Sequence, residues 1–171
     1  MTSKRTTATT AFLFALACTA AFAGEVRFGS AQLDWPDGYT VTSTKSPFEL
    51  TGPSGEKVLV TVMRPGKELP AESAASEQEK LANGVEGHLR TQASKAGKVT
   101  LPLQRSPLPD GSLLLYIGSE TSSLFSSGFF LQYLVVSPTG RLGFFTAEGK
   151  GAVEEQHGRF LPVISTVKWL P

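Results

Sequence analysis

His88 and His157 are the only histidines of the chain and the first residues to consider for metal chemistry. A metal site built on imidazoles needs several donors that converge, commonly two histidines at helical spacing. Neither histidine has a second one at such a spacing. We therefore expect no metal site, and we interpret His88 as a helix residue at the edge of an apolar face.

Glu154 and His157 form a carboxylate and imidazole pair that one helix would bring to adjacent turns. These are the residue types of a general base and acid. The alternative, which we expect, is that both are solvated groups near a helix start. A carboxylate-dependent hydrolase therefore remains a weaker alternative, and its other candidates stand in turns and at strand ends: Asp34, Asp37, Glu49, Glu120 and Glu148.

Patterns for a nucleophilic serine or a phosphate-binding loop are absent from the sequence. Ser119 follows a glycine and Ser127 precedes one, but neither lies in Gly-x-Ser-x-Gly. Residues 143–150 end in Gly-Lys, yet they have five residues between their glycines and no serine or threonine after the lysine. We expect no catalytic residue and no cofactor.

The serine-rich segment from Ser119 to Ser127 is the remaining candidate for function. It is typical of a polar loop, and it carries Leu124 and Phe125 between serines. An exposed aromatic residue there would anchor a protein partner. The simpler alternative is that both side chains pack beneath the edge of a sheet. Leu124 and Phe125 are therefore candidate binding residues only.

Residues 1–23 have the pattern of a secretory signal peptide. Lys4 and Arg5 precede an apolar run, and a small-residue Ala-Phe-Ala site ends at Ala23. We expect cleavage after Ala23, which leaves residues 24–171 as one exported domain, periplasmic or secreted.

Cys18 is the only cysteine of the chain. Lipid attachment would need a leucine three residues earlier, and Leu16 lies one place too late, so we expect no lipid anchor. The apolar run 11–18 is also far shorter than the roughly 20 residues of a membrane-spanning helix. Cleavage would leave a cysteine-free chain that depends on its core for stability.

The charges of the chain nearly balance. Removing Lys4 and Arg5 from the 16 basic residues leaves 14 against 15 acidic residues, a formal charge of −1 for the predicted mature chain. No basic run of the kind that binds nucleic acid is present. We therefore expect a protein partner rather than nucleic acid.

The elements that must position these residues are organised around segment 128–147, which is predicted to be a hairpin of two buried strands. Its first strand is apolar on both faces, with only Gln132 as an interruption, so both faces of the sheet should be covered. Turns of proline and glycine separate further strands. We expect these strands at 26–33, 39–44, 47–51, 57–63, 99–104 and 112–118.

Two helices are predicted. From Pro70 to Gly97 apolar residues recur every four positions, at Leu81, Val85, Leu89 and Ala93, which indicates an amphipathic helix. A second helix is expected within 151–169, broken near Pro162. In the first helix, Ser76 and Glu79 are expected to form a capping box, and Gly97 is expected to end the helix in a left-handed conformation. Gly84 and Gly87 would allow the helix to approach the sheet closely.

In this order of elements the chain resembles the PsbP-like fold, which includes Mog-type and DcrB-like proteins. The resemblance rests on the Trp35-Pro36-x-Gly38-Tyr39 turn, on the helix after strand 58–63, and on the ending 160–167. It implies an α+β fold, a three-layer αβα sandwich in which helices cover an antiparallel sheet.

The resemblance also implies the kind of work that proteins of this fold do. They are mostly adaptors, chaperones and assembly factors, and they share no catalytic residue. We therefore expect a non-enzymatic, exported protein-binding or assembly module. A small-ligand carrier with an apolar pocket between sheet and helix is one alternative, and an immunity or chaperone protein that binds one toxin is another.

Overall fold

A computed structural model describes residues 22–123 and 126–171 of the chain. Ten strands and two α-helices are formed by the described residues, with one short 3-10 helix at Ala71–Ser73. The helices are α1 (Ala74–Ala96) and α2 (Val153–Ile164). The strands are β1 (Phe22–Phe28), β2 (Ala31–Pro36), β3 (Thr40–Ser43), β4 (Phe48–Thr51), β5 (Lys57–Met63), β6 (Lys98–Pro107), β7 (Leu113–Ser123), β8 (Ser126–Val136), β9 (Leu142–Lys150) and β10 (Lys168–Trp169).

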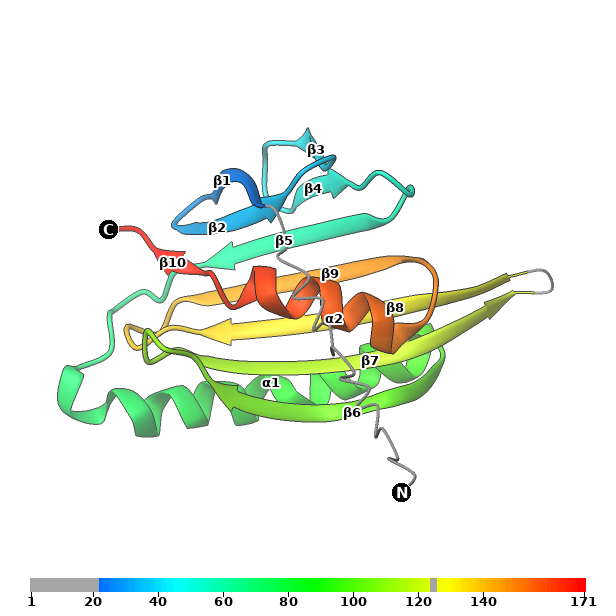
Figure 1. Ribbon diagram of the computed structural model, residues 1–171. Helices are drawn as coiled ribbons and strands as arrows, with labels where there is room; N and C mark the ends of the chain where they lie inside the picture. The colour runs from blue at the N-terminus through cyan, green and yellow to red at the C-terminus, as the bar shows by residue number, and fades with distance from the viewer. Residues whose placement is uncertain (1–21, 124–125) are drawn as a thin grey trace, which may run out of the picture.

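The strands form a seven-stranded antiparallel sheet and a small three-stranded one. The order of the large sheet is β3-β4-β5-β9-β8-β7-β6, and that of the small sheet is β1-β2-β10. Helix α1 lies on one side of the large sheet, and α2 lies on the other side beside the small sheet (Figure 1). The predicted α+β class and its three layers are confirmed.

The predicted hairpin forms the centre of the large sheet, as strands β8 and β9. Phe129, Leu131 and Tyr133 point into the core beneath α2, whereas Leu134 and Val136 point into the core beneath α1. A strand that is apolar on both faces can be buried only between two layers. This alternation therefore accounts for the three-layer arrangement.

Turns of proline and glycine separate strands as expected, and they place their glycine in the left-handed region at Gly38, Gly55, Gly111 and Gly140. A further turn lies inside the segment predicted as the single strand 26–33, and that prediction is wrong. Gly29 has a φ of 60° and, with Ser30, joins two antiparallel strands. The turn was missed because it lacks a proline.

Three expectations about α1 are wrong. The helix begins at Ala74, so Ser76 lies inside it and caps nothing. Gly97 has a φ of 168°, which is extended backbone; a glycine is required because a Cβ would lie 2.1 Å from the carbonyl oxygen of Glu120. Gly84 and Gly87 make no close approach to the sheet, since a Cβ at either would meet nothing within 4 Å.

Helix α2 is not broken at Pro162. The proline is exposed and lies in the last turn, where fewer backbone bonds depend on it. Backbone bonding continues past it, because the amide of Ser165 donates to the carbonyl of Leu161 at 3.0 Å. The chain then turns into β10 rather than continuing as helix to residue 169.

The described residues of the serine-rich segment form strands rather than the expected loop. Strand β7 continues to Ser123 and β8 starts at Ser126, with Ser122 paired to Ser127. Backbone pairing between neighbouring strands does not depend on apolar side chains, so polarity alone was a poor guide. Leu124 and Phe125 lie outside the described residues, and their proposed role remains a prediction.

On the α1 side of the sheet, the strands covered by the helix and the uncovered strands differ in burial, which leads to a stability prediction. Leu134→Ala removes a fully buried side chain and should lower the free energy of unfolding by about 2–5 kcal/mol. Leu59→Ala, at a position on β5 that is 40% exposed, should cost about 1 kcal/mol or less. Urea unfolding measures both, and equal losses would contradict the described packing.

Candidate functional site

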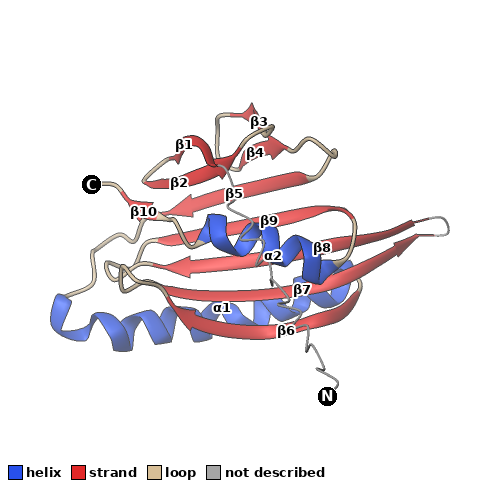
Figure 2. Ribbon diagram, viewed as in Figure 1, coloured by secondary structure: helices blue, strands red, loops and turns tan. Residues whose placement is uncertain are grey.

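Helix α1 covers only half of its side of the large sheet. It packs on β6, β7 and β8, and Figure 2 shows it lying away from β3, β4 and β5. In the described part of the chain no second helix lies on this side. We call the uncovered half the open face; its alternate side chains are Glu49, Thr51, Lys57, Leu59, Thr61, Met63, Leu142, Phe144, Thr146 and Glu148.

The strand register arranges the open face in rows, because directly paired residues share a face. One end is charged, where Glu148 pairs with Lys57. Polar residues follow, where Thr146 lies between Gln132 and Leu59. The other end is apolar, with the rows Phe144–Thr61 and Leu142–Met63.

A groove of about 420 Å³ runs where the open face meets α1. Its floor comes from β5, β8 and β9 and its wall from α1. None of its lining residues is an acid, a lysine or an arginine, so it suits neutral polar and apolar groups. The lining residues are Thr61, Gly84, Val85, His88, Gln132, Phe144 and Thr146.

Gln132 is the most informative residue of the groove floor. Its side chain is 7% exposed, and its Oε1 atom is buried without a hydrogen-bond partner. A buried amide oxygen left unpaired is unfavourable by about 1–3 kcal/mol. A bound molecule that donates a hydrogen bond would remove this cost. The signal was visible in the sequence, where Gln132 is the only polar residue between Phe129 and Val136.

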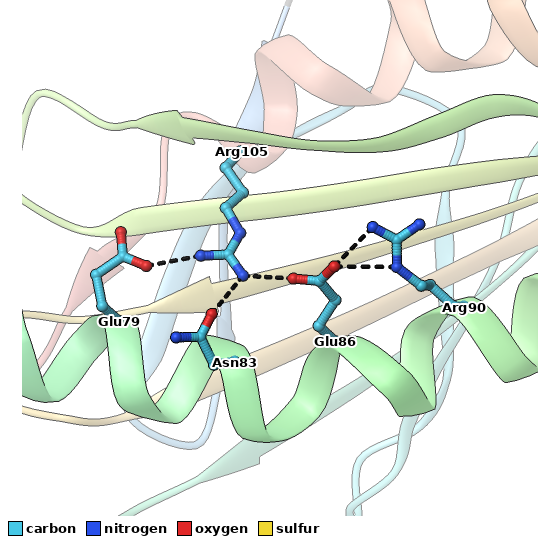
Figure 3. A network of polar contacts seen from close by, with 5 residues as sticks. All are labelled: Glu79, Asn83, Glu86, Arg90 and Arg105. Atoms are coloured by element: carbon cyan, nitrogen blue, oxygen red, sulfur yellow. Dashed lines mark hydrogen bonds and ion pairs between the residues drawn. The ribbon is translucent and has the colours of Figure 1, made fainter.

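Arg105 of β6 fixes the flank of α1 that faces away from the groove (Figure 3). Its guanidinium donates to Glu79 and to Asn83, each at 2.6 Å, and also to Glu86. Hydrogen bonds from Arg90 and then Arg105 lower the pKa of the Glu86 carboxyl. Glu79 thus binds Arg105 rather than forming the expected capping box.

Two buried hydrogen bonds align α1 with the strands. The side-chain amide of Gln78 donates to the carbonyl of Val136 at 3.0 Å, near the helix start. The hydroxyl of Ser119 donates to the carbonyl of Ala93 at 2.7 Å, near the helix end. The wall of the groove therefore runs along the strands and is held at both ends.

Glu154 and His157 do not form the pair of the weaker alternative, and His157 is half-buried rather than the solvated group that was expected. His157 lies on the α2 side, where its Nδ1 is 3.1 Å from the hydroxyl of Tyr133 and its ring lies against Tyr116. Burial lowers the pKa of His157 and raises that of Tyr133. The hydrogen bonds of the described residues include none between Glu154 and His157. A general-base arrangement is therefore not present at this position.

The candidate carboxylates do not gather at one place. Glu49 and Glu148 share the open face, but they stand on β4 and β9 with β5 between them. Glu148 shares a face with Phe130 and Glu120 with Phe129, so the two point to opposite sides of the sheet. Asp34 belongs to the small sheet, where it pairs with Glu25. Across residues 22–123 and 126–171, no three His, Cys, Asp or Glu side chains gather as metal ligands would. His88 is exposed at the groove, as expected for the edge of an apolar face.

Glu56 is a buried carboxylate that sequence reasoning missed. It is 3% exposed and accepts hydrogen bonds from the hydroxyl of Tyr39 at 2.8 Å and the amide of Ser54 at 2.9 Å. Arg159 of α2 lies 3.7 Å away. Burial, and then the bond to Glu56, raise the pKa of Tyr39. These partners make Glu56 a structural link between a turn and α2.

Comparison with solved structures finds similar folds at low identity. A crystal structure from Bacteroides thetaiotaomicron matches with a TM-score of 0.52 at 7% identity, over 83% of this chain and 46% of the other. The cyanobacterial PsbP of Synechocystis matches at 0.46 and 12% identity, over 82% and 86%. The Ran-binding protein Mog1p of Saccharomyces cerevisiae matches at 0.45 and 10%, over 86% and 84%.

These likenesses concern the fold alone. The expected resemblance to the PsbP-like fold is found among them. The chain spans about half the length of the Bacteroides protein. No family model matches the sequence, and no curated protein is significantly similar to it. Among the described helices, none is both long and apolar enough to cross a membrane.

The hydrogen bonds between Arg105 and α1 lead to a prediction. Arg105→Gln should speed amide hydrogen exchange in α1, because the helix loses its link to β6, and high salt should reduce the difference. The pKa of Glu86 is lowered in the folded protein. The stabilisation of α1 by its ionised carboxyl should therefore be present above the ordinary glutamate pKa and be lost as pH falls through the lowered value. Arg90→Gln, which leaves Arg105 in place, is the control. Equal exchange in both variants would contradict the assignment.

The buried imidazole leads to a second prediction. Since the folded state lowers the pKa of His157, the unfolded chain binds its proton more readily. Stability from this residue should be complete above about pH 6.5 and decline as pH falls from there toward the lowered value. Thermal unfolding across this range should show a shallower decline for His157→Gln than for the wild type. The exposed His88→Gln is the control, and an unchanged slope in His157→Gln would refute the prediction.

Proposed function

We propose that this chain is an exported protein-binding module whose working surface is the open face and its groove. The observation that carries the proposal is that one helix covers only half of a seven-stranded sheet. The uncovered half presents Leu59 at 40% and Met63 at 48% exposure, beside the unpaired amide oxygen of Gln132. Apolar side chains with a polar rim are typical of a surface that binds another protein.

The shape of the surface favours a protein over a small molecule. Small-molecule sites enclose most of the ligand surface, whereas this groove is open along the uncovered strands β5 and β9. The enclosed pocket expected for a ligand carrier would lie between α1 and the sheet. That space is filled by side chains of the second core, among them Leu89, Leu115 and Leu134.

The geometry supports a hydrolase less well. The imidazole of His157 faces tyrosines, and the Glu120 and Glu148 carboxylates lie on opposite faces. An immunity or chaperone protein would also act by binding another protein, and no separate observation favours this alternative. Export is supported by the signal-peptide pattern of residues 1–23.

The proposal predicts the effect of a charge on the open face. Met63→Glu should reduce recovery of a native complex from the source cells at least tenfold, because a carboxylate would have to be buried at the interface. Val41→Glu is the matched control: Val41 is 40% exposed but pairs with Leu50, on the opposite side of the sheet. Gentle affinity purification after crosslinking measures recovery, and a wild-type protein recovered alone would contradict the proposal.

A further inference from the structure

We infer that the element of the partner seated on the open face is a single amphipathic α-helix of about 14 residues, antiparallel to α1. The inference rests on the proposed function and specifies the chemistry of the partner. It follows from the length of the face, its width, its wall and its distribution of charge.

The length of the face is set by the strand register. From the Leu142–Met63 row to the Glu148–Lys57 row the strands advance six residues, or about 20 Å at 3.4 Å per residue. An α-helix of about 14 residues spans the same distance at 1.5 Å per residue. Helix α1 follows this direction, since Gln78 bonds to Val136 at one end and Ser119 bonds to Ala93 at the other.

The width of the face suits one helix. Strands β9, β5 and β4 follow one another at about 4.8 Å, so their axes span about 10 Å, close to one helix diameter. The uncovered area is roughly 200–300 Å² with the outer half-strands included. This is well below the ~800 Å² per partner of a standard stable interface, so the face suits a single helix rather than a whole domain. Helix α1 covers the neighbouring strands β6, β7 and β8 on the same side, so only the uncovered strands are open to a partner.

The wall of the groove, formed by α1, would allow a second helix to pack closely against it. Gly84 lines the groove, and a Cβ there would meet nothing within 4 Å. Glycine weakens a helix interior, and no contact within the described chain requires it at this position. A helix lying beside α1 would meet backbone at Gly84 and the apolar side chain of Val85.

The chemistry of the face changes along its length. Leu142, Met63 and Phe144 suit leucine-like residues at one end, and Gln132 suits a hydrogen-bond donor in the middle. At the far end lies Lys57 of the open face. Lys150, two residues beyond Glu148 on β9, lies on the same side of the sheet, and Lys95 lies in the last turn of α1. Glu148 is the only acid of the face in that row, and the ion pairs of the described residues include none of these three lysines.

Charge complementarity sets the direction of the partner helix. The basic end of the face favours acidic residues in the partner. Acidic residues stabilise the first turn of a helix, because the helix dipole is positive there. Since the basic end lies beside the C-terminus of α1, a partner helix with an acidic first turn runs antiparallel to α1.

The test uses a designed 14-residue peptide with an acidic first turn, leucines at helical spacing and a central glutamine. Its controls are a peptide of the same composition with the leucine spacing scrambled, and one with a basic first turn. Fluorescence anisotropy with the full mature protein should show saturable binding of the first peptide, at least tenfold tighter than of the scrambled one. Met63→Glu should weaken it at least tenfold, and Val41→Glu should leave it unchanged.

Two further variants test the chemistry at single positions. Gln132→Leu keeps the apolar volume but removes the amide, and it should weaken binding several-fold. Lys57→Glu leaves Lys150 and Lys95 against two carboxylates, so it should abolish the preference, and the peptides with acidic and basic first turns should bind equally. Circular dichroism of each variant verifies that the fold is retained.

Equal binding of the amphipathic and scrambled peptides, or binding of neither, would overturn the inference. If the native complex still depends on Met63 in that case, the proposed function stands and only the helical partner is wrong. A dimer in analytical ultracentrifugation that Met63→Glu dissociates would instead identify a second copy as the occupant.

Discussion

The architecture depends on strand β8, an inner strand of the large sheet whose side chains are apolar on both faces except at Gln132. Such a strand is stable only between two covering layers, and α2 with the small sheet supplies one while α1 supplies the other. One helix is too narrow to cover seven strands. The covering on the α1 side therefore ends near β9, and the strands beyond it remain open (Figure 2).

The parts of the fold that could be predicted are those encoded in local periodicity. The β8–β9 hairpin and α1 followed from apolar spacing, and four turns followed from proline and glycine. The β1–β2 turn at Gly29 and the strands around Ser122 were missed because backbone pairing leaves little trace in residue type. The extended Gly97 could not be predicted, since its cause is the distant carbonyl of Glu120.

The candidate site could be predicted only in fragments. Gln132 stood out in an apolar strand, but its meaning depends on the groove beside it. That groove exists because β5 pairs with β9, an arrangement between segments far apart in sequence. Likewise, nothing in the sequence connects Arg105 with Glu79 and Glu86, although this contact holds the wall of the groove. The sequence candidates Leu124 and Phe125 lie outside the described residues.

The central claim is that the open face, rather than the opposite side of the sheet, is the working surface. Site-specific photo-crosslinking in the source cells tests it most directly, with the crosslinker placed at residue 59 or at residue 41. Both positions are 40% exposed in the wild type but lie on opposite sides of the sheet. The account predicts a discrete crosslinked partner from position 59 and none from position 41. The reverse pattern, or no partner from either position, would contradict it.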